Sequence, residues 1–251
     1  MSVFLTLVRR ELGGFFKSLT GYVVIAAVLL LNGFALMDLV DKFNGRPLET
    51  PLTELYYATA YFWIILLLTA PVITMRSYAA EKSTGTYEAL MTTPISEWQV
   101  VLAKFAGAWV FFMLTWLPLL VVCFTLRRVT GEPALCDPRV MTATFLGIGL
   151  LGALYMSLGC LASALTRSQI VAAMISFLVG IGLWVISLRP SGGGGGSTGW
   201  WEPVLNHMSL VRHMEDFTRG LIDGRHLVYY VTVTAWLLFV TQRVVQSRRW
   251  Q

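Results

Sequence analysis

The chain has 251 residues, of which 56% are hydrophobic and only 13% are charged. A soluble domain carries about 25% charged residues, so this composition excludes a single soluble core and favours a membrane protein. The net charge of +5 comes from the basic side of the membrane topology described below, and nothing in it suggests a surface for nucleic acid.

The first 17 residues predict an amphipathic helix that lies on the membrane surface. Arg9, Arg10 and Lys17 fall outside a stripe of apolar side chains at helical spacing. The alternative is a frayed terminus. A cleaved signal is not expected, because charged residues interrupt any short apolar core. The stripe consists of Phe4, Leu5, Val8, Leu12, Phe15 and Phe16.

Six segments are predicted to cross the membrane. Five of them contain uncharged runs of at least about 18 residues, the length that a spanning helix needs. The sixth run, residues 227–242, is shorter, but Arg225 and Arg243 can snorkel to the two interfaces. We therefore expect an all-α polytopic membrane protein that forms a single domain over residues 1–251. The predicted spans are 19–39, 55–75, 101–126, 140–166, 168–188 and 227–245.

The distribution of charge predicts that both termini are cytoplasmic. One side of the membrane receives ten of the 19 basic residues but only four of the 14 acidic ones. Positively charged loops stay on the cytoplasmic side. The expected location is the cytoplasmic (inner) membrane, crossed several times.

Small residues and prolines occur within the predicted spans. Gly149, Ala153 and Ser157 recur at four-residue steps in the fourth span, with Gly159 and Ser163 on a neighbouring row. Such rows let helices approach closely, so we expect packing within the protein, with a substrate path as the alternative. Two prolines, at positions 71 and 118, can bend the second and third spans as hinges or as fixed kinks.

The sequence contains no cluster of catalytic residues. Chemistry inside a bilayer needs ionisable groups there, and the five long runs contain none. The histidines at 207, 213 and 226 fall in the last outer loop. Because His207 and His213 are six residues apart, we expect them to lie on the surface and not to share a metal ion. No glycine precedes a lysine, so the chain lacks a phosphate loop. The three cysteines are scattered, and no structural disulfide is expected.

A polar segment separates the second and third predicted spans. Gly85 interrupts a helix over "AAEKST", and residues 86–91 form a further short helix that Pro94 ends. Ser96 and Gln99 then have the spacing of a capping box at the start of the third span. From these residues alone, a solvated connector and a docking surface are equally good interpretations.

This segment resembles a known family. The stretch "AAEKSTGTYEALMTTPISEWQVVLAKF", residues 79–105, is similar to the signature of ABC-2 type transporter permeases, and most closely to the small six-span type that includes gliding-motility-associated permeases. The matching residues are Glu81, Lys82, Gly85, Thr86, Glu88, Leu90, Pro94 and Lys104. The resemblance implies a cytoplasmic coupling helix that docks on a separate ATP-binding subunit. The residues expected to couple are Glu81, Lys82, Gly85, Thr86, Tyr87, Glu88 and Leu90.

Two further stretches carry the resemblance. "VRRELGGFFKSLTGYV" fits a surface helix that enters the first span, and "LVRHMEDFTRGLIDGRHLVYY" is similar to the outer segment before the last span. In the family this outer segment forms short helices that cap the translocation path. The outer gate candidates are Phe217, Arg219, Gly220 and Asp223.

The outer segment also has a pattern of its own. Leu210, Met214, Phe217 and Leu221 form an apolar stripe, and two oppositely charged pairs, 212 with 216 and 215 with 219, stand at four-residue spacing. This segment is too short to span, so we expect an interfacial helix in the outer leaflet. A glycine-rich stretch, residues 191–198, precedes it and acts as a flexible tether, natural or inserted.

The resemblance implies the permease subunit of an ATP-driven transporter, an exporter of unidentified substrate that works by alternating access. It implies that ATP and magnesium bind a partner subunit, and that a second permease copy or paralogue completes the pathway. This chain would hold no cofactor and no metal, and it would not be an enzyme. The alternatives are a membrane scaffold that recruits a cytoplasmic partner through the same loop, a passive channel and a lipid-modifying enzyme.

Overall fold

The computed structural model describes residues 3–43, 52–86, 96–130, 137–188 and 207–247. These residues form helices joined by turns, with no strand among them. Six helical stretches are long and apolar enough to cross a membrane, which confirms the predicted all-α protein with six transmembrane helices. They are Leu19–Leu39, Ala60–Thr84, Glu97–Thr125, Pro138–Leu165, Gln169–Ser187 and Gly224–Ser247. The glycine-rich stretch 191–198 lies outside the described residues.

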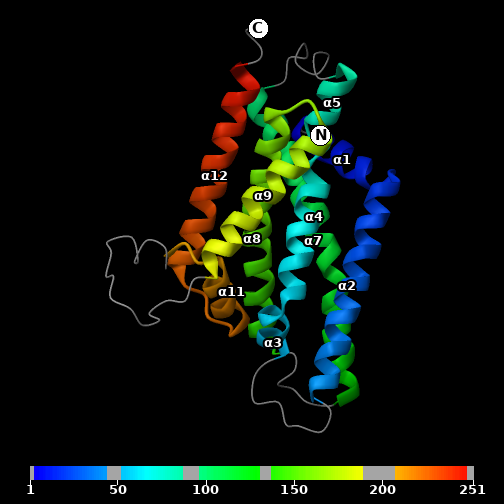
Figure 1. Ribbon diagram of the computed structural model, residues 1–251, viewed down its shortest axis with the longest axis vertical. Coiled ribbons are helices and arrows are strands. Elements are labelled where there is room, and N and C mark those ends of the chain that lie inside the picture. Colours follow the sequence, from blue (N-terminus) through cyan, green and yellow to red (C-terminus); the bar gives the residue numbers. More distant parts are fainter. Residues whose placement is uncertain (1–2, 44–51, 87–95, 131–136, 189–206, 248–251) are drawn as a thin grey trace.

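The long helices pack side by side as a bundle (Figure 1). Their bounds are α1 Val3–Phe16, α2 Leu19–Phe43, α3 Leu52–Ala58, α4 Ala60–Thr74, α5 Ala79–Thr84, α7 Glu97–Thr130, α8 Pro138–Leu165, α9 Gln169–Ser187, α11 Leu210–Thr218 and α12 Gly224–Ser247. The short α1, α3, α5 and α11 lie at the two ends of the long helices. One end carries α1, α5 and the last turns of α12, and we call it the α5 end. The opposite end carries α3 and α11, and we call it the α11 end.

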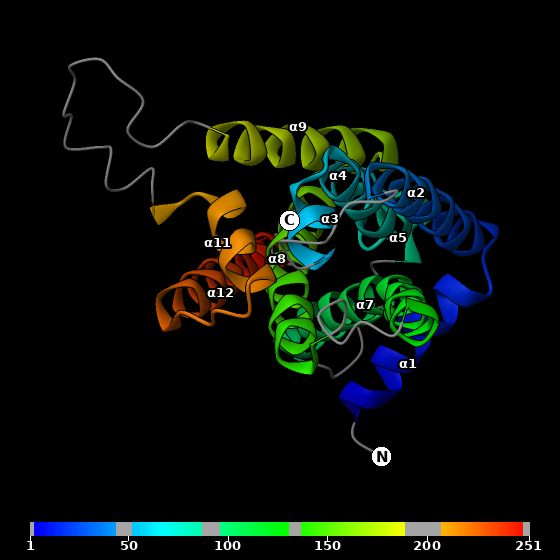
Figure 2. The same ribbon diagram turned by 90° about the horizontal axis from the view of Figure 1, so that it is seen from below.

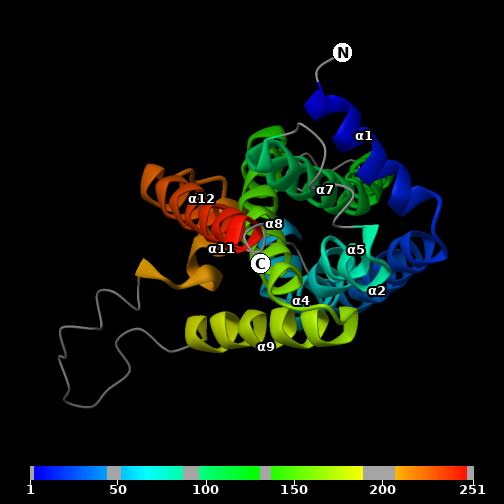
Figure 3. The same ribbon diagram turned by 90° about the horizontal axis from the view of Figure 1, so that it is seen from above.

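Helix α8 is the centre of the bundle. It packs against α4, α7, α9, α11 and α12, and these helices surround it when the bundle is viewed along its length (Figures 2 and 3). Its glycines make this contact possible: a Cβ atom on Gly152 would lie 2.3 Å from the Phe112 ring, and one on Gly159 would lie 2.0 Å from the Thr74 hydroxyl. Ser157 and Ser163 are fully buried. The predicted packing role of the small-residue rows is therefore confirmed at Ser157, Gly159 and Ser163, whereas Ala153 is half-buried and Gly152 was not among the predicted residues.

The second predicted span, residues 55–75, is divided in the structure. Thr59 has an extended backbone, and α3 ends before it while α4 begins after it. The Thr59 amide donates to the Tyr56 carbonyl, which closes the last turn of α3. Pro71 lies inside α4 as expected, and the helix continues past it to Thr74. Hydropathy alone did not show this break because both helices are apolar.

The predicted amphipathic helix is present as α1, which packs against α7 and α2. The Phe15 ring stacks on Phe111 of α7, with ring centroids 4.6 Å apart. Leu7 is buried, whereas Leu5 is 54% exposed. The face of α1 that meets α7 is centred on Leu7 and Glu11, and the contact of the predicted stripe with the membrane stays a prediction.

Candidate functional site

Helix α5 extends the chain beyond α4 at the α5 end of the bundle. It ends at Thr84, and the next residue, Gly85, has a φ of 74°, which lies in the left-handed region that favours glycine. This confirms the predicted interruption after "AAEKST". Thr84 and Thr86, on either side of Gly85, join through their hydroxyls at 2.9 Å, and Thr86 and Gly85 are exposed. The other expected coupling residues, Tyr87, Glu88 and Leu90, lie outside the described residues.

A buried lysine connects α5 to two other helices. Lys104 of α7 is only 3% exposed. Its Nζ atom lies 2.8 Å from Glu81 Oε1 of α5 and 3.2 Å from Glu11 Oε1 of α1. Arg10 reaches the same two carboxylates, at 3.0 Å from Glu11 and 3.4 Å from Glu81. A buried charge is tolerated only with such partners, so the four residues, which we call the Lys104 network, hold α1, α5 and α7 together.

The second charged residue of α5 is also turned toward the bundle. The Lys82 ammonium donates to the Ala164 carbonyl near the end of α8. The hydroxyl of Ser163, the residue before Ala164, accepts hydrogen bonds from the Tyr78 and Ala79 amides, both at 3.0 Å, and donates to the Met75 carbonyl at 3.1 Å. The start of α5 is thus fixed on α8 by a side chain of the small-residue row.

The structure separates the expected coupling residues into two groups. Glu81 and Lys82 contact α7 and α8, whereas Gly85 and Thr86 are exposed at the surface. Sequence reasoning missed Glu11 as a partner of Lys104. A signal was available, because Glu11 stands three residues after Val8 and four before Phe15, within the apolar face of an amphipathic helix.

The start of α7 agrees with the predicted cap. The Ser96 hydroxyl accepts from the Gln99 amide at 3.4 Å, and the Ser96 carbonyl accepts from the Gln99 and Val100 amides. Further along α7, the Trp109 indole donates to the Gly149 carbonyl of α8 at 2.8 Å. These contacts fix the helix that carries Lys104 to the centre of the bundle.

At the opposite end, α11 lies against α8, α3 and α9. Leu210, Met214 and Phe217 are buried, as the stripe predicted. Leu221 is 59% exposed, so its place in the stripe is wrong. The reason is Gly220, whose φ of 82° turns the chain after α11.

The four outer gate candidates lie within this turn or next to it. Phe217 packs over Gly147 of α8, where a Cβ atom would lie 2.8 Å from the ring. Arg219 donates through Nε and Nη2 to Glu54 Oε1 of α3, at 2.9 and 2.7 Å. The predicted partner of Arg219 was Glu215, four residues earlier in the chain. The Asp223 carboxylate accepts from the Arg225 amide at 2.9 Å, and this hydrogen bond lowers the pKa of Asp223.

The three histidines form a cluster. The expectation that His207 and His213 lie on the surface is right for His207, which is exposed, and wrong for His213, which is buried. His213 is 2% exposed, and its ring lies 3.9 Å from that of His226 and 6.3 Å from that of His207, measured between centroids. The expectation treated them as points on one helix, but α11 and α12 fold against each other and bring them together. Burial lowers the pKa of His213 to about 4. Among the described residues no group of three His, Cys, Asp or Glu side chains is placed to hold a metal ion.

Comparison with known proteins gives the family of the chain. Residues 37–192 match the family model of the ABC-2 family transporter proteins, and this range runs from the end of α2 to the residues after α9. No curated protein matches the chain. The likeness of the first and last segments to the family lies outside the matched range and stays a prediction. Since the match covers more than half of the residues, the chain belongs to the ABC-2 family of transporter proteins.

Proposed function

We propose that this chain is a permease subunit that receives its energy at the α5 end, from a separate ATP-binding subunit that docks on the segment after Gly85. The observation that carries the proposal is the Lys104 network. It gives the helix that precedes the docking segment a direct ionic connection to the third span and to α1.

The contacts of α5 suggest how movement would pass into the membrane. A displacement of the segment after Gly85 pulls on α5. Glu81 then acts on α7 through Lys104, while Lys82 and the Ser163 hydroxyl act on α8. The third and fourth spans therefore follow α5, and this is the motion that alternating access requires.

Topology and family support the remaining assignments. By the positive-inside rule, the α5 end and both termini would lie in the cytoplasm, and the protein would lie in the inner membrane. ATP and magnesium would be bound by the partner subunit, and a second permease copy or paralogue would line the other half of the pathway. Transport would run outward, away from the α5 end. The turn formed by Phe217, Arg219, Gly220 and Asp223 would cover the outer exit.

Stimulated ATP hydrolysis tests the proposal. The chain is co-purified with its ATP-binding subunit, and ATPase activity is compared between wild type, Gly85→Leu and Glu88→Lys. Gly85→Leu forces a side chain into a left-handed backbone, and Glu88→Lys reverses a charge within the docking segment. Both variants should lose stimulated activity while they remain in the membrane.

The control is Glu215→Lys, the same reversal of charge on an exposed residue of the α11 end, and it should keep full stimulation. Unchanged stimulation in both test variants would refute docking after Gly85. A stable complex that hydrolyses ATP without moving any substrate would favour the alternative function, a scaffold.

A further inference from the structure

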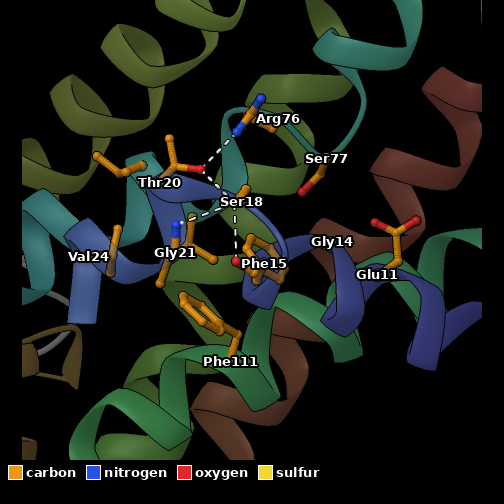
Figure 4. Close-up of a pocket in the computed structure, with 12 residues that line it drawn as sticks. Glu11, Gly14, Phe15, Ser18, Thr20, Gly21, Val24, Arg76, Ser77 and Phe111 are labelled. Atoms are coloured by element: carbon orange, nitrogen blue, oxygen red, sulfur yellow. Dashed lines mark hydrogen bonds between the residues drawn. The ribbon is translucent and has the colours of Figure 1, made fainter. Parts of the chain in front are cut away.

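A cavity of about 230 Å³ opens at the α5 end between α1, α2, α4 and α7 (Figure 4). One part of its lining is polar and includes Ser18, Thr20, Arg76 and Ser77. The other part is apolar and includes Phe15, Val24, Val72, Ile73 and Phe111. A water molecule needs only about 10–15 Å³ of such space, so the cavity can take a group the size of a phosphate ester.

Arg76 gives this cavity a positive charge. Among the described residues Arg76 has no carboxylate partner, and its Nη1 donates to the Thr20 hydroxyl at 2.8 Å. Glu11 also lines the cavity, but its carboxylate is already neutralised by Lys104 and Arg10. A guanidinium has five N–H donors in a planar fork that matches phosphate oxygens, so Arg76 keeps donors for an anion.

The position of the cavity matches the headgroup level of a bilayer. Ser18 comes just before the first span, which begins at Leu19, and Arg76 follows the end of α4 at Thr74. Val24 and Val72 lie about one turn further into the apolar stretch. Arg76 and Val72 are exposed, so the cavity is open to its surroundings. A ligand with a phosphate and an adjoining apolar part fits this order of polar and apolar lining.

We propose that the cavity binds the phosphate group of a phospholipid from the leaflet at the α5 end. Arg76 would hold the phosphate, the hydroxyls of Ser18 and Thr20 would accompany it, and the start of the acyl chains would lie against Val24 and Val72. The lipid would then fill the space between α1 and the spans. This site does not depend on the docking of an ATP-binding subunit.

Lipid binding by the purified protein tests the proposal. Phosphatidylglycerol is titrated into the detergent-solubilised chain, and bound lipid is counted by native mass spectrometry. Arg76→Gln should weaken the tightest binding about tenfold or more, the loss expected for a charged hydrogen bond. The matched control is Arg243→Gln, an exposed arginine at the same end of the bundle, and it should bind as wild type does.

A second pair of variants keeps Arg76 and changes only the space. Gly14 lines the cavity and Gly13 does not, yet a Cβ atom on either meets nothing within 4 Å. Leucine is favoured over glycine inside helices, so both variants should fold. Gly14→Leu fills the cavity and should weaken lipid binding, whereas Gly13→Leu should not.

Two results would overturn the proposal. One is wild-type lipid binding in both Arg76→Gln and Gly14→Leu. The other concerns the midpoint of thermal unfolding. If inorganic phosphate without lipid raises this midpoint as much as phosphatidylglycerol does, the ligand is a soluble anion.

Discussion

Replacement of Lys104 by methionine should destabilise the protein strongly. The variant Lys104→Met keeps most of the apolar volume but leaves the carboxylates of Glu11 and Glu81 without their buried cation. Removal of one partner of a buried ion pair costs about 3–5 kcal/mol. The two glutamate side chains are 19% and 22% exposed, and Arg10 still reaches both carboxylates. Water and Arg10 therefore compensate in part, and we expect a loss of about 3 kcal/mol. For a chain of this size the midpoint of thermal unfolding should fall by about 6–12 °C.

The protein contains its own probe for this measurement. The side chains of Cys123 and Cys160 are buried, so a thiol-reactive fluorescent dye reports their exposure as the protein unfolds. Cys136 is first replaced by serine, which leaves these two. The control is Lys17→Met, because Lys17 is an exposed lysine at the same end, and its midpoint should not move.

A double variant tests the cause. Lys104→Met together with Glu81→Gln should be more stable than the sum of the single losses predicts, because the double variant removes the buried cation together with one of the two carboxylates that it pairs with. A midpoint for Lys104→Met within about 2 °C of wild type, which corresponds to less than about 1 kcal/mol, would refute the reasoning.

Two more predictions concern the same unfolding midpoint. The dye measures it for the glycine variants, and circular dichroism measures it for the pH series, because only the thiolate form of cysteine reacts with the dye. Gly159→Ala should cost about 1–3 kcal/mol, because its Cβ atom would lie 2.0 Å from the Thr74 hydroxyl, whereas Gly182→Ala, which faces open space, should cost nothing; equal midpoints would contradict this packing. Stability should be constant above about pH 6.5 and fall as the pH is lowered toward 4, by up to about 1.4 kcal/mol per pH unit. The reason is that the unfolded chain binds a proton at His213, with an ordinary pKa of 6.5, before the folded protein does at about 4. His213→Phe should flatten this slope, and a slope unchanged in that variant would assign it to another group.

The spans could be predicted because a bilayer imposes its thickness on the sequence. Each crossing needs about 20 apolar residues in a row, and a run of that length is visible without any knowledge of its neighbours. Even the short sixth run was identified correctly: α12 extends from Gly224 to Ser247, and it contains Arg225 and Arg243 near its ends. Local signals also located the break at Gly85 and the cap at Ser96.

The contacts between distant residues could not be predicted from local pattern. Glu11 and Lys104 are 93 positions apart, and Glu54 and Arg219 are 165 apart. Each pair depends on how two helices are rotated about their axes, which hydropathy does not fix. The histidine cluster was missed for the same reason, since His213 and His226 belong to different helices. The docking role of residues 86–91 stays a prediction.

The Ser163 hydroxyl has a mechanical consequence. It satisfies a carbonyl at the end of α4 and two amides at the start of α5, and in a membrane each such group left unpaired costs several kcal/mol. The corner between α4 and α5 therefore cannot swing away from α8 as a free joint. The corner and α8 form one rigid unit, which extends along α5 as far as Gly85. A force that acts on α5 itself therefore reaches the middle of the bundle through this corner, without first stretching a loop.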